Sequence, residues 1–135
     1  MKTLSAFAPP LTLALTLGAL SLGACATTAP PPPLTVTEAQ AGPVALARGQ
    51  ALEIVLPLNA GTGYTWRLDR EAPTLVLNGG SSRTTDTGRP GGPVTTAFSY
   101  QGVGRGRADL SFTLKRPWEP DKPDDRKAVF HVKVR

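Results

Sequence analysis

The feature that most constrains the fold of this chain is a strict alternation of apolar and polar residues in several short segments. The clearest segment covers residues 108–115, where Ala, Leu, Phe and Leu alternate with Asp, Ser, Thr and Lys. A period of two is typical of a β-strand with one buried face, because successive side chains point to opposite sides of a sheet. The residues expected on the outward face are Asp109, Ser111, Thr113 and Lys115. The same pattern recurs at residues 52–58, 64–68, 94–100 and 128–134.

Weaker strand signals fill the spaces between these segments. Apolar residues at 34–46 indicate a first strand that is broken near Gly42-Pro43. Residues 75–77 and 83–85 indicate two weak strands, and the Asn, Gly and Ser residues at 78–82 indicate a turn between them. About seven short strands separated by turn signals are the pattern of an all-β, antiparallel sandwich or barrel.

Three connections are longer or richer in Gly, Pro and charged residues than the others. They cover residues 59–63, 86–93 and 116–126. Consecutive strands of an antiparallel sandwich run in opposite directions, so every second connection lies at the same end. Because these three connections alternate with plain turns, we expect them to gather at one end, and loops on a rigid scaffold commonly carry recognition.

The N-terminal segment resembles a bacterial export signal. Lys2 gives it a positive start, residues 11–22 form a short apolar run, and Leu22-Gly23-Ala24-Cys25 ends it with small residues. This ending looks like a lipobox, in which the cysteine is acylated; the alternative is an incidental cysteine beside an ordinary cleavage site. We therefore expect a signal peptide at residues 1–24 and a lipid anchor at Cys25. Such a protein is exported to the cell envelope and held on a bacterial membrane, at the periplasmic face or the cell surface.

A proline-rich tether follows the cysteine. Residues 25–33 end in four consecutive prolines, a composition that favours polyproline II, with a rise of about 3 Å per residue, and cannot bury a core. The domain itself is expected at residues 34–135. Because Cys25 is the only cysteine, this domain has no disulfide and depends on its packed core.

Charge and residue inventory disfavour several classes of function. The formal charge is +5, but the cations are scattered among acids, so nucleic-acid binding is not expected, whereas an anionic membrane would attract them modestly. The single histidine, His131, is placed outward on the last strand with no second His or Cys, so we interpret it as a surface residue. We expect no enzyme, no cofactor and no metal.

An acidic group in the last long connection has two interpretations. Asp121, Asp124 and Asp125 lie beside Lys122 and Arg126. Clustered carboxylates can bind calcium, but the adjacent cations favour a solvated charge cluster.

The two tryptophans have different settings. Trp66 alternates with Tyr64 and Leu68, which predicts a core position. Trp118 lies between prolines in the last long connection, where no alternation buries it. It is either an exposed anchor for a partner or a plug that folds back on the sandwich end, and the sequence leaves both open.

With the three connections located, the chain resembles the chagasin-like inhibitors of papain-type cysteine proteases, which have an immunoglobulin-like fold. The first connection, Leu-Asn-Ala-Gly-Thr-Gly-Tyr-Thr-Trp at residues 58–66, is similar to that family's Asn-Pro-Thr-Thr-Gly-Tyr-x-Trp. Arg116-Pro117-Trp118 matches its Arg-Pro-Trp, and Gly88-Arg89-Pro90-Gly91-Gly92 looks like its Gly-rich middle loop. The resemblance covers residues 34–135 and is broken where Ala60-Gly61 replaces the family's Pro-Thr.

The resemblance implies an immunoglobulin-like antiparallel sandwich of about seven strands that inhibits papain-like cysteine proteases. The first loop would lie over the catalytic Cys and His of the protease, with the Gly-rich loop and Trp118 on either side. Inhibition would then be occlusion of the cleft by a monomer without a reactive residue. The implied protease-binding residues are Asn59, Ala60, Gly61, Thr62, Gly63, Tyr64, Gly88, Pro90, Gly91, Gly92, Arg116, Pro117 and Trp118.

Two other functions are compatible with the same residues. The Ala60-Gly61 tip lacks a rigid ring and a hydroxyl, and looser loops bind less tightly. A cell-envelope binding or assembly module on the same scaffold, without protease inhibition, is therefore the alternative. A membrane lipoprotein with a structural role and no specific ligand is the third hypothesis, since a fold alone does not settle function.

Overall fold

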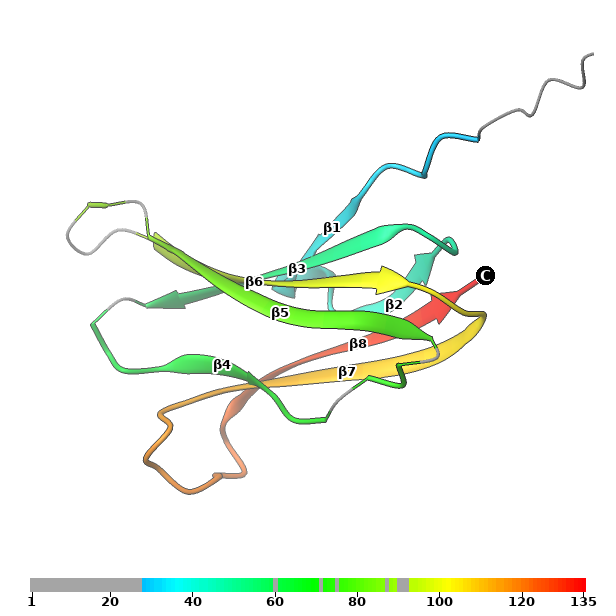
Figure 1. Ribbon diagram of the computed structural model, residues 1–135. Coiled ribbons are helices and arrows are strands. Elements are labelled where there is room, and N and C mark those ends of the chain that lie inside the picture. The colour runs from blue at the N-terminus through cyan, green and yellow to red at the C-terminus, as the bar shows by residue number, and fades with distance from the viewer. Residues whose placement is uncertain (1–27, 60, 71, 75, 87, 90–92) are drawn as a thin grey trace, which may run out of the picture.

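The computed structural model describes residues 28–59, 61–70, 72–74, 76–86, 88–89 and 93–135. Over these residues eight β-strands form two four-stranded sheets that pack face to face (Figure 1). One sheet has the order β1-β3-β6-β5 and the other β2-β8-β7-β4. The elements are β1 (Leu34–Thr37), the 3-10 helix η1 (Glu38–Gln40), β2 (Gly42–Leu46), β3 (Ala51–Asn59), β4 (Thr65–Leu68), β5 (Leu77–Asp86), β6 (Pro93–Gly102), β7 (Gly106–Lys115) and β8 (Arg126–Val134).

The core between the sheets is built from the apolar halves of the alternating segments. Leu110, Phe112 and Phe130 are fully buried. The ring centroid of Phe112 lies 4.5 Å from that of Phe98 in the opposite sheet and 6.1 Å from that of Phe130 on the neighbouring strand. The predicted all-β sandwich and its buried faces are therefore confirmed.

The chain between residues 34 and 46 departs from the prediction of one broken strand. β1 and β2 are edge strands of opposite sheets, and η1 connects them. Each pairs in parallel with its neighbour, β1 with β3 and β2 with β8. Over the described residues the sandwich thus has eight strands and two parallel edge pairs, whereas about seven antiparallel strands were predicted. Gly42, with φ +129°, stands where the chain enters the second sheet, a conformation that favours glycine.

The predicted turn at residues 78–82 is wrong, because β5 runs through it as one strand. The pairing of β5 with β6 shifts register between Gly79 and Ser81, as in a β-bulge. Gly79 has φ +129°, and a Cβ there would lie 2.5 Å from the carbonyl oxygen of Ser99. These glycines therefore allow a bulge in β5 and a close approach of its backbone to β6. In a sequence, a Gly-rich segment can indicate either a bulge or a turn. Leu75, predicted to begin a strand here, lies outside the described residues.

Two residues of β7 that the alternation places outward are buried. Only 4% of Thr113 and 6% of Lys115 is exposed. The hydroxyl of Thr113 donates to Asp69 Oδ2 at 2.9 Å, and Lys115 Nζ pairs with Asp121. Strand alternation predicts the face on which these residues lie but carries no information about connections that fold over the sheet and bury them.

The connections divide cleanly between the two ends of the sandwich. The β3–β4, β5–β6 and β7–β8 connections lie at one end, and the β2–β3, β4–β5 and β6–β7 connections lie at the other (Figure 1). The gathering of the three long connections at one end is thereby confirmed. Within the described part of the chain, no helix has the length and apolar character needed to cross a membrane.

Candidate functional site

The β3–β4 connection, called the first loop here and covering residues 59–64, is closed by its own polar groups. The hydroxyl of Thr62 donates a hydrogen bond to the carbonyl oxygen of Asn59 at 2.8 Å. Gly61 and Gly63 have φ values of +79° and +77°, which favour glycine. The tip is thus a tight turn with a defined backbone on either side of Ala60, which lies outside the described residues.

The β7–β8 connection, called the third loop and covering residues 116–125, consists of two β-turns. The backbone N–H of Glu119 donates to the carbonyl of Arg116 at 3.1 Å, and that of Asp125 donates to the carbonyl of Lys122 at 3.2 Å. Each turn has a proline at its second position, where the fixed φ of proline fits. The first turn carries Trp118 at its third position, so the indole is presented at the tip of a proline-stiffened turn.

Trp118 is an exposed side chain that rests on the first loop. Its exposed fraction is 72%, so it does not plug the end of the sandwich. A Cβ built on Gly63 would lie 2.6 Å from Trp118 Cη2, which shows that the indole edge occupies the space a side chain there would need. The ring is therefore positioned by contact with Gly63 while most of its surface is open to a partner.

Arg116 joins the first and third loops. Its Nε donates to the carbonyl oxygen of Thr62 at 2.9 Å, and its guanidinium lies 4.9 Å from the ring centroid of Tyr64. Charge-assisted hydrogen bonds and cation–π contacts of this kind add to each other in fixing the loops. Arg116 therefore holds the first and third loops together, in addition to being a predicted protease contact. The Arg-Pro-Trp motif alone did not reveal this structural role.

A chain of charges stiffens the third loop further. Arg116 Nη1 and Lys122 Nζ contact the two carboxylate oxygens of Glu119 at 3.0 Å and 2.6 Å. The hydrogen bond from Lys122, followed by that from Arg116, holds the pKa of Glu119 below its ordinary value. The hydrogen bond with Glu119 in turn raises the pKa of Lys122. Both groups stay charged across the neutral range, so the loop keeps these ties at physiological pH.

The base of the third loop is fixed by an ion pair that involves a buried lysine. Lys115, at the end of β7, pairs with Asp121, whose carboxylate also lies 3.3 Å from Arg67 Nη2 on β4. The hydrogen bond from Lys115 lowers the pKa of Asp121. Asp125 Oδ2 accepts the backbone N–H of Lys122 at 2.8 Å. Two of the three carboxylates in the acidic group, Asp121 and Asp125, therefore bind groups of the loop and of the strand ends beside it. Such contacts are typical of a charge cluster.

The β5–β6 connection, called the second loop and covering residues 87–92, is described only in part. The backbone N–H of Gly88 donates to Asp86 Oδ1 at 3.0 Å, and Gly88 has φ +69°. The second loop ends beside the start of the first loop, because Pro93, the first residue of β6, pairs with Asn59, the last residue of β3. The predicted contacts Pro90, Gly91 and Gly92 lie outside the described residues, as does Cys25.

The remaining aromatic predictions have separate outcomes. Trp66 is buried and its Nε1 donates to the carbonyl of Pro57 at 2.8 Å, which confirms its core position. Tyr64 precedes β4 and is half-buried beneath Arg116, so it belongs to the loop edge and not to the alternating core. His131 is exposed on β8, with Nδ1 2.8 Å from Asp109 Oδ1.

A β-sandwich that presents stiffened loops and an open tryptophan at one end is a recognition scaffold. Residues 45–134 match the family model described as "Chagasin family peptidase inhibitor I42". This chain belongs to the chagasin family of peptidase inhibitors, a family of inhibitors and not of enzymes. The matched region includes all three loops of the edge.

Solved structures of similar fold include named protease inhibitors. The cysteine protease inhibitor EhICP2 from Entamoeba histolytica aligns with a TM-score of 0.67 and 22% identity, over 77% of this chain and 96% of its own. Amebosin aligns with a TM-score of 0.63 and 24% identity, over 78% and 100%. PbICP-C, solved in complex with falcipain-2, aligns with a TM-score of 0.54 and 21% identity, over 76% and 89%. A comparison with curated proteins finds no match.

The contact between Gly63 and Trp118 gives the first prediction. In Gly63→Ala the new methyl group would occupy the position of the indole edge, so Trp118 must move. Gly61→Ala is the matched control, since Gly61 has nearly the same φ but open space around its Cβ position. In ¹H–¹⁵N spectra we expect the Trp118 indole signal to shift in Gly63→Ala only, with the Trp66 signal unchanged. Equal shifts in both variants would contradict the contact.

The Lys115–Asp121 pair gives a second prediction, about pH. The pKa of Asp121 in the folded protein lies below its ordinary value of 3.8, so its contribution to stability is present above about pH 4 and is lost as the pH falls through the lower, folded value. We expect the wild type to be more stable than Asp121→Asn at neutral pH, and the difference to shrink below about pH 4. Urea denaturation at several pH values measures this. Asp124→Asn, in the same loop, is the control and should show a smaller difference at neutral pH, since Asp124 has no ion pair among the described residues.

Proposed function

We propose that this protein inhibits papain-like cysteine proteases by inserting its three-loop edge into the active-site cleft. Membership of the chagasin family is the observation that carries the proposal, because the matched region contains the whole edge. Two structures of similar fold, a cysteine protease inhibitor and PbICP-C in complex with falcipain-2, support the same class of target.

Inhibition by occlusion requires loops whose shape fits the protease cleft, and it requires no reactive group on the inhibitor. The first loop would cover the catalytic Cys and His of the protease, while Trp118 and the second loop would contact the cleft on either side. Loops that are already ordered lose little entropy on binding, so more of the contact energy appears as affinity. The ties from Arg116 to Thr62 and Tyr64, and the rest of Trp118 on Gly63, support this preorganisation.

The unusual tip of the first loop is compatible with the proposal. Gly61 stands where the family motif has Thr, and its φ of +79° is one that a β-branched residue adopts only with strain. The Thr62 hydroxyl closes the turn on Asn59. Glycine at position 61 therefore serves a specific backbone conformation.

The third prediction tests the function directly. All residues of the buried apolar core lie between Val36 and Val134, so a fragment of residues 28–135 contains the complete core. We expect this fragment to inhibit papain in a titration, and Trp118→Ala to weaken inhibition by about 2 kcal/mol, roughly 30-fold, as for a central aromatic anchor. Arg70→Ala, an exposed change at the other end, is the control and should leave inhibition unchanged.

Two results would count against the proposal. Absence of inhibition at micromolar protein by a folded fragment would exclude papain-like enzymes as targets. Recovery of a different envelope partner in a pull-down, with no protease, would then favour the binding or assembly module. Full inhibition by Trp118→Ala would show that the indole makes no essential contact.

We further propose that the chain is lipid-anchored to a bacterial membrane through Cys25, with the loop edge facing away from the bilayer. The lipobox-like sequence supports the anchor. The orientation is supported by the position of the tether, since residues 28–33 leave the sandwich at the end opposite the three loops (Figure 1). Gln50 Nε2 donates to the carbonyl oxygen of Pro32 at 2.8 Å, which joins the tether to the β2–β3 turn.

The fourth prediction concerns this anchor. Expression of the full chain in a bacterium should give a membrane-bound protein that incorporates labelled palmitate. Cys25→Ala should abolish the label and move the protein to the soluble fraction of the envelope. Release without loss of label, or label in Cys25→Ala, would contradict acylation at this residue.

A further inference from the structure

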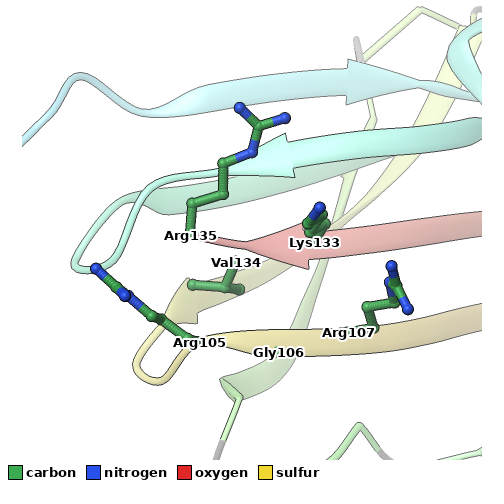
Figure 2. A pocket seen from close by; sticks show the side chains of 6 residues that line it. All are labelled: Arg105, Gly106, Arg107, Lys133, Val134 and Arg135. Atoms are coloured by element: carbon green, nitrogen blue, oxygen red, sulfur yellow. The ribbon is translucent and has the colours of Figure 1, made fainter.

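A group of cations lies at the end of the sandwich opposite the loops. Arg107 on β7 pairs in register with Lys133 on β8, and both side chains are exposed on the outer face of their sheet. Arg105 precedes β7 and Arg135 follows β8, so they extend the group to the strand ends. These four residues, with Gly106 and Val134, line an open depression of about 600 Å³. Figure 2 shows their side chains. Arg48, in the β2–β3 turn, adds a fifth exposed cation. These five residues, Arg48, Arg105, Arg107, Lys133 and Arg135, are called the basic end.

The basic end differs from the loop edge in how its charges are compensated. Among the described residues, none of its five cations has an acidic partner within ion-pair distance. At the loop edge, by contrast, ion pairs hold Arg67, Lys115, Arg116, Lys122 and Arg126. Among the described residues, more cations without an acidic partner therefore lie at the basic end than at the loop edge, where Arg89 and Lys127 are unpaired.

The acids near the basic end are few and already engaged. Asp109 lies two residues beyond Arg107 on β7, and its carboxylate contacts His131. Asp69 accepts hydrogen bonds from Ser111 and Thr113 at 2.7 Å and 2.9 Å. The β4–β5 connection adds Arg70 and Glu71 in sequence, whose charges cancel. These carboxylates are fewer than the five cations, so this end keeps a net positive charge.

The tether emerges beside the basic end. Gln50, which binds the carbonyl of Pro32, is two residues from Arg48 in the same turn. The backbone N–H of Arg48 donates to the carbonyl of Arg135 at 3.3 Å, and the N–H of Arg135 donates to the carbonyl of Leu46 at 3.0 Å. The point where the chain leaves the domain and the basic end are thus parts of one hydrogen-bonded surface.

We propose that the basic end binds the anionic phospholipid headgroups of the membrane to which the chain is tethered. This inference rests on the proposed lipid anchor, which would hold this end nearer to a bilayer than the loop edge. Each cation at an anionic surface contributes about a fivefold gain in binding, and this attraction decays within a Debye length. The anchor supplies a high local concentration of lipid, so a weak surface contact is enough to orient the domain. The result is a sandwich that stands on the membrane with its inhibitory loops outward.

The test uses the unacylated fragment of residues 28–135, so that the surface is measured apart from the anchor. We expect it to cosediment at low salt with vesicles of phosphatidylglycerol and phosphatidylcholine, and not with vesicles of phosphatidylcholine alone. Raising the salt to about 0.15 M should weaken binding strongly, since the Debye length falls to about 8 Å. The combined variant Arg105→Gln, Arg107→Gln, Lys133→Gln and Arg135→Gln should bind anionic vesicles about 600-fold more weakly, at about fivefold for each of the four cations.

A matched control separates the basic end from net charge. Arg89→Gln with Lys127→Gln removes two exposed cations that have no ion pair among the described residues and lie at the loop end. This variant should keep vesicle binding that Arg107→Gln with Lys133→Gln loses. Equal loss in both double variants, binding to neutral vesicles, or tighter binding to duplex DNA than to vesicles would overturn the proposal. So would saturation of the depression by millimolar glycerol phosphate without vesicle binding, which would indicate a small-anion site.

Papain inhibition by the same variants keeps the two proposals distinct. The four-residue variant should inhibit papain as the wild type does, because the basic end lies opposite the loops. Normal inhibition with no vesicle binding by the wild-type fragment would refute the membrane contact and leave the inhibitor proposal intact. Vesicle binding without inhibition would refute the inhibitor proposal alone.

Discussion

The packing of Phe112 against Phe98 and Phe130 holds the two sheets face to face, and the position of every loop depends on it. Phe98 belongs to β6, whose neighbours β3 and β5 lead into the first and second loops. Phe112 and Phe130 belong to β7 and β8, which carry the third loop. A buried aromatic cluster therefore fixes the spacing of strand ends in opposite sheets, and so the width of the surface that a partner meets.

The loops are held by polar interactions, in contrast to the apolar packing of the core. Lys115 is buried under the third loop and pairs with Asp121, while Arg116 reaches to Thr62 and Tyr64. Consecutive residues of one strand end thus fasten two different loops. Ion pairs of exposed groups contribute little to stability one at a time, but a network that involves a buried lysine can define one loop conformation. At this edge, polar interactions fix the conformation of the loops more than they raise the free energy of unfolding.

Much of the fold could be predicted from alternation, because a half-buried strand leaves its period in the sequence. The three long connections and the core position of Trp66 followed from the same pattern. The parallel edge strands could not be predicted, since residues 34–46 show apolar character but not the sheet to which each half belongs. Burial of Lys115 was hidden because it depends on a connection that folds over β7. The position of the exposed Trp118 ring could not be predicted either, because it depends on contact with Gly63, and no spacing in the sequence encodes that contact.

The parallel pairing of β1 with β3 also determines how the domain bears mechanical load. The tether enters at the start of β1, and the first loop follows the end of β3, at the opposite end of the pair. If a bound protease is pulled away from the membrane, the two strands are drawn past each other along their length. The backbone hydrogen bonds that join residues 34–37 to residues 52–55 are then strained together, in shear, instead of opening one after another. If the proposed anchor and protease binding hold, this edge strand of four residues carries the load between them in the shear direction.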